Sequence, residues 1–137
     1  MDPVGGPIVN VLFIEDDRMN RRVVRDMLDV AGVEMAEAES AETGLAMLDA
    51  GDYQMLLVDL RMPGMDGFTA IERIRGRGDA KAAVPIIVVT ADTAVDLRER
   101  CLAAGADEVL FKPVAMDALF EAMGRIMAAG SDGGMIL

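Results

Sequence analysis

The chain of 137 residues is long enough for one domain with its own core, and a hydrophobic content of 53% argues against disorder. Its formal net charge of −11 makes direct nucleic-acid binding unfavourable, because an acidic chain repels a phosphate backbone. The absence of histidine excludes a Ser-His-Asp or Cys-His mechanism, a histidine metal ligand and a phosphohistidine on this chain.

The cysteine content, the length of the apolar runs and the N-terminal residues indicate the cellular compartment. Cys101 is the single cysteine, which excludes an intramolecular disulfide and suits a reducing compartment. The longest apolar runs, such as those at 55–58 and 86–89, are too short to cross a membrane. Residues 1–10 lack the basic start and apolar stretch of a signal peptide. We therefore expect a soluble, cytoplasmic protein that does not bind a membrane.

Apolar runs alternate with amphipathic stretches five times along the chain. In chain order, this pattern predicts a strand at 9–15, a helix at 18–31, a strand at 33–38 and a helix from the N-cap Ser40 through Leu48. A strand at 54–60 precedes a turn-rich loop at 62–67, a helix at 68–75 and a flexible stretch at 76–83. A strand at 85–90, a helix at 93–104, a strand at 108–111 and a helix at 115–128 complete the pattern.

This order of elements predicts an α/β fold. We expect one domain at 9–128, preceded by an N-terminal tail at 1–8 and followed by a C-terminal tail at 129–137. Repeated strand–helix units with short connections favour a parallel sheet that is covered by helices on both faces. Ligands of such folds bind at the carboxyl ends of the strands, so polar residues at those ends are the candidate site residues.

Polar side chains follow four of the predicted strands at this edge of the sheet. Glu15 and Asp16 end the first strand, and Asp59 lies at the end of the third. Thr90 ends the fourth strand, and Lys112 follows the fifth. Each residue is ordinary by itself, because strand ends are often polar. Together they place three carboxylates, one hydroxyl and one ammonium at a single edge.

This set of groups is suited to phosphoryl transfer. Neighbouring carboxylates repel one another, and Mg²⁺, which prefers oxygen ligands and keeps several waters, relieves that repulsion. Asp16 and Asp59 can each supply one oxygen to the ion and leave positions for water or a phosphoryl group. A carboxylate can act as the nucleophile, and the cation neutralises the charge that develops. Thr90 can donate a hydrogen bond to one phosphoryl oxygen, and Lys112 can act as a point charge on another.

These motifs resemble the signature of bacterial response-regulator receiver domains. The resemblance covers about residues 9–128, and it implies a flavodoxin-like parallel sheet of five strands in the order 2-1-3-4-5 with five helices. The segment 15–28 is also similar to receivers attached to hybrid histidine kinases. The matching motifs are Glu15-Asp16, Asp59 within LVDLRMPGMDG at 57–67, Thr90 within PIIVVTA at 85–91, and Lys112-Pro113.

The resemblance implies a role for each matched residue. Asp59 would be the phosphoacceptor, and Thr90 and Lys112 would contact the phosphoryl group. The implied Mg²⁺ ligands are Asp16 and Asp59 directly, Glu15 through water, and Arg61 through its backbone carbonyl.

Two details of the resemblance concern geometry. The separation between Asp16 and Asp59 is the usual one in the family, so Asp16 is preferred as the direct metal ligand and Asp17 remains the alternative. The bond between Lys112 and Pro113 is expected to be cis, as it usually is in the family, whereas most X-Pro bonds are trans.

The sequence departs from the family pattern at Val109, where most receivers carry an aromatic residue that turns inward with the hydroxyl of the fourth strand. This leaves open how phosphorylation would be coupled to a change of shape. The side chains of Arg61 and Asp92 flank the expected site and could tune hydrolysis, although the sequence slightly favours solvated positions for both.

The expected function is a phosphoacceptor receiver that catalyses its own Mg²⁺-dependent phosphorylation and dephosphorylation. Its phosphoryl donor would be the phosphohistidine of a sensor histidine kinase or histidine phosphotransferase. A face formed by the fourth helix, fifth strand and fifth helix would then bind a downstream protein target. The alternative is a receiver-fold binding module that works without phosphorylation. A stand-alone phosphatase or flavodoxin is disfavoured, because Asp59-Leu60-Arg61 lacks the Asp-x-Asp motif and the first loop lacks a Ser/Thr-rich phosphate site.

Overall fold

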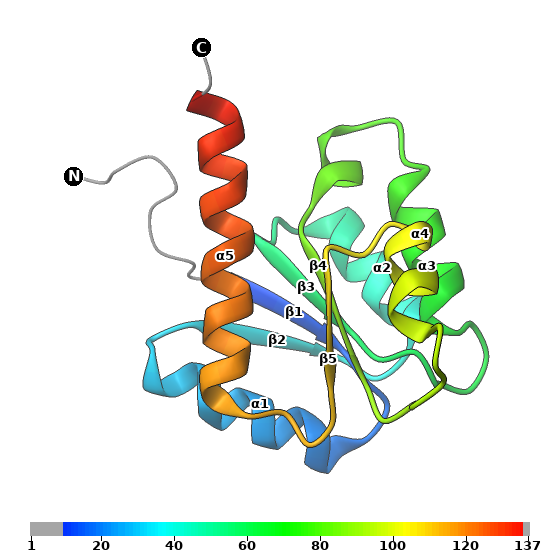
Figure 1. Cartoon of the computed structure of the whole chain (residues 1–137). Helices are drawn as coiled ribbons and strands as arrows, with labels where there is room; N and C mark the ends of the chain where they lie inside the picture. Colours follow the sequence, from blue (N-terminus) through cyan, green and yellow to red (C-terminus); the bar gives the residue numbers. More distant parts are fainter. Residues whose placement is uncertain (1–9, 136–137) are drawn as a thin grey trace.

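Five parallel strands form the centre of the molecule (Figure 1). The computed structural model describes residues 10–135, with side chains described through residue 129, so the predicted tail at 1–8 lies outside the described residues. The strands pair in the order β2-β1-β3-β4-β5, which confirms the predicted fold class and sheet order. Their bounds are β1 Asn10–Ile14, β2 Glu34–Ala38, β3 Met55–Val58, β4 Ile86–Thr90 and β5 Glu108–Phe111.

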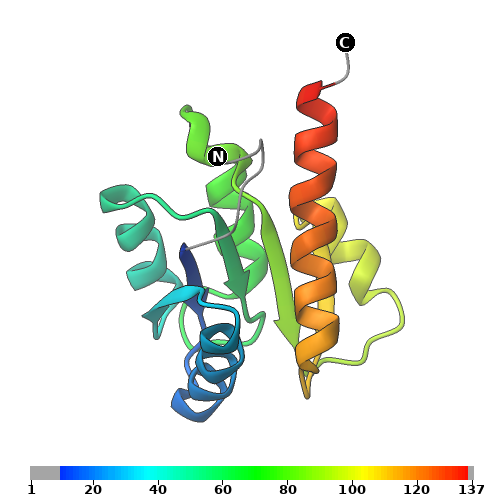
Figure 2. The same ribbon diagram turned by 90° about the vertical axis from the view of Figure 1, so that its left-hand side faces the viewer.

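Helices cover both faces of this sheet. Helices α1 and α5 pack on one face, and Figure 2 shows α5 alongside the sheet, to the right of β1 and β3. Helices α2, α3 and α4 pack on the other face. The bounds are α1 Arg18–Val30, α2 Ala41–Ala50, α3 Gly67–Arg75, α4 Leu97–Ala104 and α5 Met116–Met135, with a 3₁₀ turn, η1, at Ala80–Ala83.

The core is divided by the sheet into two apolar layers, because successive strand side chains point to opposite faces. On β1, Leu12 and Ile14 belong to the layer under α2, α3 and α4, whereas Val11 and Phe13 belong to the layer under α1 and α5. All four are fully buried. Burial on both faces explains why the central strands are continuous apolar runs in the sequence.

Side-chain caps set the first turns of α2 and α3 on the site side of the fold. The Ser40 hydroxyl accepts a hydrogen bond from the N–H of Thr43 at the start of α2, as the sequence predicted. The Asp66 carboxylate accepts one from the N–H of Thr69 at the start of α3.

Two helix boundaries differ from the prediction. Helix α4 begins at Leu97 rather than at residue 93, because the residues before it bond locally: Ala94 donates its N–H to the Asp92 carboxylate. Such side-chain bonds compete with helix formation. Helix α5 continues to Met135, past the predicted end at Ala128. The added stretch contains glycines but no proline, and glycine weakens a helix by only about 1 kcal/mol per residue.

Candidate functional site

Four parallel strands bring the predicted site residues to one edge of the sheet. The register pairs Ile14 with Val58 and Val58 with Val88, so the residues that follow β1 and β3 lie beside the end of β4. Carboxylate oxygens of Glu15, Asp16 and Asp59 all lie within 4.8 Å of one another. The sequence therefore predicted correctly that these three acids meet.

Lys112 reaches two of these acids from the end of β5. Its Nζ donates a hydrogen bond of 2.8 Å to Oε1 of Glu15 and lies 3.6 Å from Oδ1 of Asp59. Glu15 and Asp59 are buried, with 1% and 4% of their surfaces exposed. The bond from Lys112 to Pro113 is cis, which confirms the prediction from the resemblance.

Burial disfavours the charged forms of Glu15 and Asp59, and the ammonium of Lys112 offsets this effect only in part. Burial raises the pKa of Glu15 to about 7, despite the opposing hydrogen bond from Lys112, and the nearby Asp59 charge adds to the rise. Burial also raises the pKa of Asp59, while Lys112 and the N–H of Arg61 oppose that rise. Burial alone would lower the pKa of Lys112, but the hydrogen bond to Glu15 and the Asp59 charge outweigh it, and the pKa rises.

Asp16 and Asp17 have different positions. Asp17 is the N-cap of α1, and its Oδ1 accepts hydrogen bonds from the N–H groups of Met19 and Asn20 at 2.8 and 3.3 Å. The exposed Asp16 instead contributes its carboxylate to the acidic cluster. The third acid of the run therefore has a local structural role.

The loop after β3 approaches Asp59 through a glycine. A Cβ at Gly67 would lie 2.5 Å from the backbone oxygen of Asp59 and 2.8 Å from the Cα of Leu60. The N–H of Gly67 also donates to the oxygen of Leu60 at 3.0 Å. In the sequence this glycine is only one residue of a turn-rich loop. Its contact with the phosphoacceptor candidate became apparent from the fold.

Thr90 and Asp92 are linked by a hydrogen bond at the end of β4. Thr90 is fully buried, and its Oγ1 accepts a hydrogen bond of 3.1 Å from the N–H of Asp92. The Asp92 carboxylate in turn accepts a hydrogen bond of 2.9 Å from the guanidinium of Arg61. Arg61 is largely solvated, as the sequence favoured, with 75% of its side chain exposed, whereas Asp92 is only 21% exposed; the ion pair between them was not predicted. The two loops lie close enough for their opposite charges to pair.

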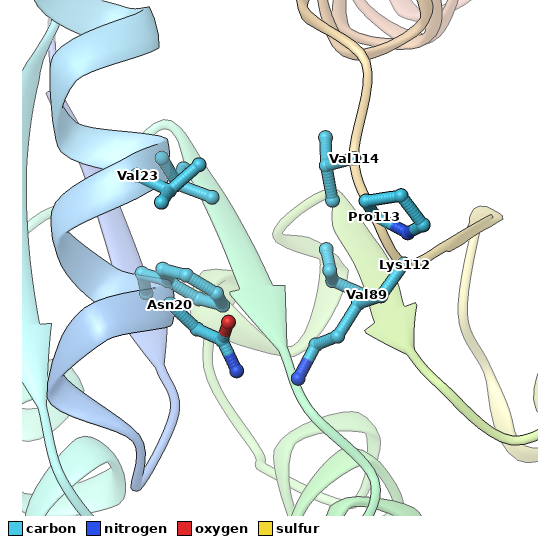
Figure 3. A pocket seen from close by; sticks show the side chains of 8 residues that line it. Asn20, Val23, Val89, Lys112, Pro113 and Val114 are labelled. Atoms are coloured by element: carbon cyan, nitrogen blue, oxygen red, sulfur yellow. The ribbon is translucent and has the colours of Figure 1, made fainter.

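An apolar hollow of about 140 Å³ lies beside the acidic cluster, between α1 and the segment after β5 (Figure 3). Val23 on α1, Val89 on β4 and Val114 form apolar walls, while Asn20 and Lys112 stand at its border. Lys112 thus belongs both to the acidic cluster and to this hollow. The hollow has no signal in the sequence, because its lining comes from four separate parts of the chain.

The donor set fits a hard divalent cation. Three oxygen ligands converge, two of them from buried carboxylates whose burial disfavours the charged form. One ammonium compensates only part of the charge of three acids. A cation at this position would relieve the remaining repulsion, and oxygen ligands are those that Mg²⁺ prefers.

This combination of fold and site defines the class of phosphoryl-regulated receiver modules: a 2-1-3-4-5 parallel sheet with an acidic cluster, a hydroxyl and an ammonium at its carboxyl edge. The sequence profile of the response regulator receiver domain matches residues 11–124. The chain therefore belongs to the response regulator receiver domain family.

Individual relatives are receiver-containing sensor proteins. The chain is 35% identical over 109 residues to the sensor histidine kinase RcsC of Salmonella typhi. It is 32% identical over 124 residues to the virulence sensor protein BvgS of Bordetella bronchiseptica. The matches cover 80% and 88% of this chain but 11% and 10% of the relatives, so the chain spans about a tenth of their length.

Solved structures with the same fold include further receivers. A receiver domain of a sensor histidine kinase from Pseudomonas aeruginosa, with a magnesium ion coordinated in its active site cleft, superimposes with a TM-score of 0.80 at 29% identity, covering 89% of this chain and 99% of that one. A response regulator receiver protein from Pseudomonas putida superimposes with a TM-score of 0.78 at 29% identity, covering 88% and 98%. Within residues 10–135, no helix combines the length and apolar character that crossing a membrane requires.

Proposed function

We propose that this receiver accepts a phosphoryl group on Asp59 from the phosphohistidine of a partner protein. The observation that carries the proposal is the convergence of the Glu15, Asp16 and Asp59 carboxylates, two of which, Glu15 and Asp59, also face the ammonium of Lys112. A carboxylate oxygen of Asp59 forms a bond to phosphorus as the bond from phosphorus to the imidazole nitrogen breaks, and the imidazole leaves as the neutral base after protonation by solvent. Attack by water on phosphorus later releases inorganic phosphate and restores the carboxylate.

The chain's own residues divide the work of this transfer. Asp16 and Asp59 would hold Mg²⁺ directly, Glu15 through water and Arg61 through its backbone carbonyl. When bound, Mg²⁺ neutralises charge on the phosphoryl oxygens. Lys112 places its ammonium on another phosphoryl oxygen, and the Thr90 hydroxyl donates a hydrogen bond to a third.

The different positions of Asp16 and Asp17 support Asp16 as the direct ligand. Asp17 is committed to two backbone N–H groups at the start of α1, whereas Asp16 faces the other acids. We expect Asp16→Asn to weaken Mg²⁺ binding at least about tenfold, since a charged ligand is lost. Asp17→Asn keeps a capping oxygen and should change the affinity far less. A larger loss in the Asp17 variant, measured by Mg²⁺ titration, would reverse the assignment.

The donor is inferred to dock over α1 and the apolar hollow of Figure 3. Met19 and Val23 are exposed by 68% and 43% on α1, one helical turn apart, and Val23 also lines the hollow. Because the hollow borders Lys112, an apolar helical face that covers it would bring a histidine on that face to the acidic cluster. A sensor histidine kinase or histidine phosphotransferase is the expected partner. The cytoplasm is the expected location, since such donors are charged from ATP.

Receivers respond to phosphorylation by binding a protein target, and we propose the surface of α4, β5 and α5 for this contact. The acidic net charge supports a protein target rather than nucleic acid.

The functional unit is proposed to be residues 9–128, with tails at 1–8 and 129–137. The second candidate is a receiver-fold binding module that acts without phosphorylation. It is favoured only by Val109, which is buried and lacks an aromatic ring.

Incubation with acetyl phosphate and Mg²⁺ tests the phosphoacceptor. The wild-type chain should gain the mass of one phosphoryl group, because Asp59 is the carboxylate at the centre of the cluster. Asp59→Asn should gain none, while Asp29→Asn, which removes an exposed acid from α1, should behave as wild type. Undiminished phosphorylation of the Asp59 variant would refute the assignment. A wild-type chain that gains no mass would favour the phosphorylation-independent module.

A further inference from the structure

The ion pair between Arg61 and Asp92 connects the two loops that border Asp59. Arg61 lies in the loop after β3, Asp92 in the loop after β4, and their side chains meet at 2.9 Å. The Arg61 side chain is 75% exposed, so it can change partner at little cost in packing. The Asp92 side chain is more restricted by its neighbours, because only 21% of it is exposed.

Asp92 also holds the approach to α4 through a chain of hydrogen bonds. Its Oδ1 accepts from the N–H of Ala94 at 3.0 Å, and the oxygen of Ala94 accepts from the N–H of Leu97, the first residue of α4, at 3.2 Å. The preceding Asp96, at the N-cap position, makes no side-chain capping bond. The start of α4 is therefore positioned by the loop that contains Asp92.

Phosphorylation would create a competitor for Arg61. A phosphoryl group on Asp59 brings more acceptor oxygens than the Asp92 carboxylate, and each oxygen can accept a further hydrogen bond beside the contacts with Mg²⁺, Lys112 and Thr90. Arg61 follows Asp59 by two residues, and its backbone N–H already donates to the Asp59 carboxylate. Arginine binds phosphate with two parallel hydrogen bonds, which favours the exchange further.

We propose that the Arg61–Asp92 ion pair is a latch that phosphorylation opens, because Arg61 transfers its guanidinium from the Asp92 carboxylate to the phosphoryl group on Asp59. This inference rests on the proposed phosphoacceptor function of Asp59. When Arg61 leaves, the Asp92 carboxylate can shift. Ala94 is hydrogen-bonded to Asp92 and Leu97 to Ala94, so the first turn of α4 shifts with it. The latch thus supplies a difference between the two states that Val109 cannot supply, since valine is short, stiff and here buried.

An exchange of partners makes a distinctive prediction: the two halves of the ion pair have opposite effects. Beryllium trifluoride, a phosphoryl mimic that binds the acceptor carboxylate with Mg²⁺, can be titrated against the chain with ¹⁹F NMR as the readout. Asp92→Asn removes the competitor and should tighten binding about two- to fivefold, the range expected for an exposed pair. Arg61→Gln removes the group that is transferred, keeps the backbone carbonyl, and should weaken binding by a similar factor.

Matched variants separate the latch from simple changes of charge. Asp96→Asn removes an acid from the same loop without breaking an ion pair. Arg100→Gln removes a cation whose charge also acts on Asp92 and which stacks over Phe68 at 4.9 Å. Each control should shift the affinity less than its partner variant. In the double variant Arg61→Gln/Asp92→Asn, the gain from the Asp92 change should disappear.

Amide NMR spectra give a second readout at residues 94–97. In apo Asp92→Asn these amides should lie part of the way toward their positions in the wild-type adduct, whereas in apo Asp96→Asn they should not. The latch is refuted if both halves of the pair shift the affinity in the same direction, or if Asp92→Asn matches Asp96→Asn. If the wild-type chain forms no adduct at Asp59, the phosphoacceptor function itself fails, and the latch fails with it.

Discussion

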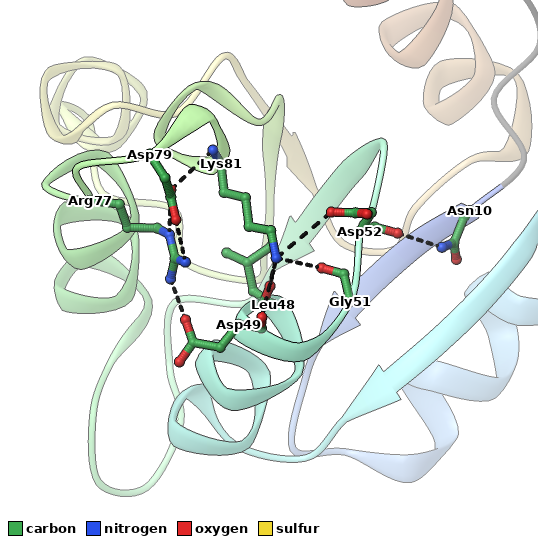
Figure 4. A network of polar contacts seen from close by, with 8 residues as sticks. All are labelled: Asn10, Leu48, Asp49, Gly51, Asp52, Arg77, Asp79 and Lys81. Atoms are coloured by element: carbon green, nitrogen blue, oxygen red, sulfur yellow. Dashed lines mark hydrogen bonds and ion pairs between the residues drawn. The ribbon is translucent and has the colours of Figure 1, made fainter.

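Two lysines at opposite ends of the sheet have similar burial and different surroundings. Lys112, at the carboxyl end, and Lys81, at the amino end, have side chains that are 18% and 26% exposed. Lys81 donates to the backbone oxygens of Leu48, Asp49 and Gly51 at 2.7, 3.3 and 3.0 Å (Figure 4). These oxygens end α2, where the helix dipole favours a cation. The amino-end lysine therefore satisfies groups that would otherwise lack partners.

Two acidic side chains near Lys81 are paired with an arginine. Arg77 pairs with Asp79 and Asp49 at 2.9 and 2.6 Å, next to the lysine in Figure 4. At the carboxyl end, by contrast, the partners of Lys112 are buried carboxylates whose pKa values are raised. The amino end is an arrangement of satisfied polar groups, and the carboxyl end retains charge that a cation or phosphoryl group can use. This difference separates a structural cluster from a chemical site.

The largest expected effect tests the chemical side of this comparison. Lys112→Met should weaken the beryllium trifluoride adduct about 10- to 100-fold, the range for losing a hydrogen bond to a charged group. The variant should remain folded, and its amide shifts on α4 in response to the adduct should be reduced. Far-UV circular dichroism and amide NMR spectra check both points. Wild-type shifts on α4 in this variant would contradict a role for Lys112 in the response.

The pH dependence of Mg²⁺ binding sharpens the same contrast. The folded-state pKa of Glu15 is about 7, compared with 4.5 ordinarily, so this group's contribution to stability is present below pH 4.5 and is lost as the pH rises through 7. Mg²⁺ binding favours the ionised form. The affinity of the chain for Mg²⁺ should therefore rise about tenfold between about pH 6 and 8. Glu15→Gln should flatten this dependence, and an unchanged slope in that variant would contradict the role of Glu15.

The structural side of the comparison predicts a loss of stability without a loss of chemistry. Lys81→Met should lower the free energy of unfolding by about 1–2 kcal/mol, because three oxygens near the end of α2 lose a charged donor. Urea unfolding measures this change. Phosphorylation of Asp59 by acetyl phosphate should keep its wild-type rate. A slowed reaction in a folded Lys81→Met variant would show that the two ends of the sheet are coupled.

The smallest effect on switching is expected at Val109. Val109→Ala should cost about 1–2 kcal/mol of stability by removing buried methyl groups, and it should leave phosphorylation-dependent partner binding largely intact. Thr90→Ala removes a hydroxyl within the site and should impair that binding about tenfold. Partner affinity with and without phosphorylation decides between them. If a folded Val109→Ala variant loses the difference, this position is part of the switch.

The sequence by itself determined the α/β class and the residues of the acidic cluster. Both are encoded locally: apolar runs predict strands, and a parallel sheet brings residues at the carboxyl ends of its strands together wherever they lie in the chain. Asp59 and Lys112 could therefore be placed beside one another from their positions after two strands. The strand order and the roles of these residues came from the resemblance to receivers.

Only the tertiary structure decided which polar groups pair. Arg61 meets Asp92 across two loops, and Lys81 meets the end of α2 about thirty residues away in sequence. A long charged side chain has many reachable partners, and no local pattern selects one of them. The choice depends on which loops and helix ends the packed sheet brings within about 3 Å, the distance at which hydrogen bonds form. The start of α4 was decided in the same way, because the bond from Ala94 to Asp92 replaces the helical turn that composition favoured.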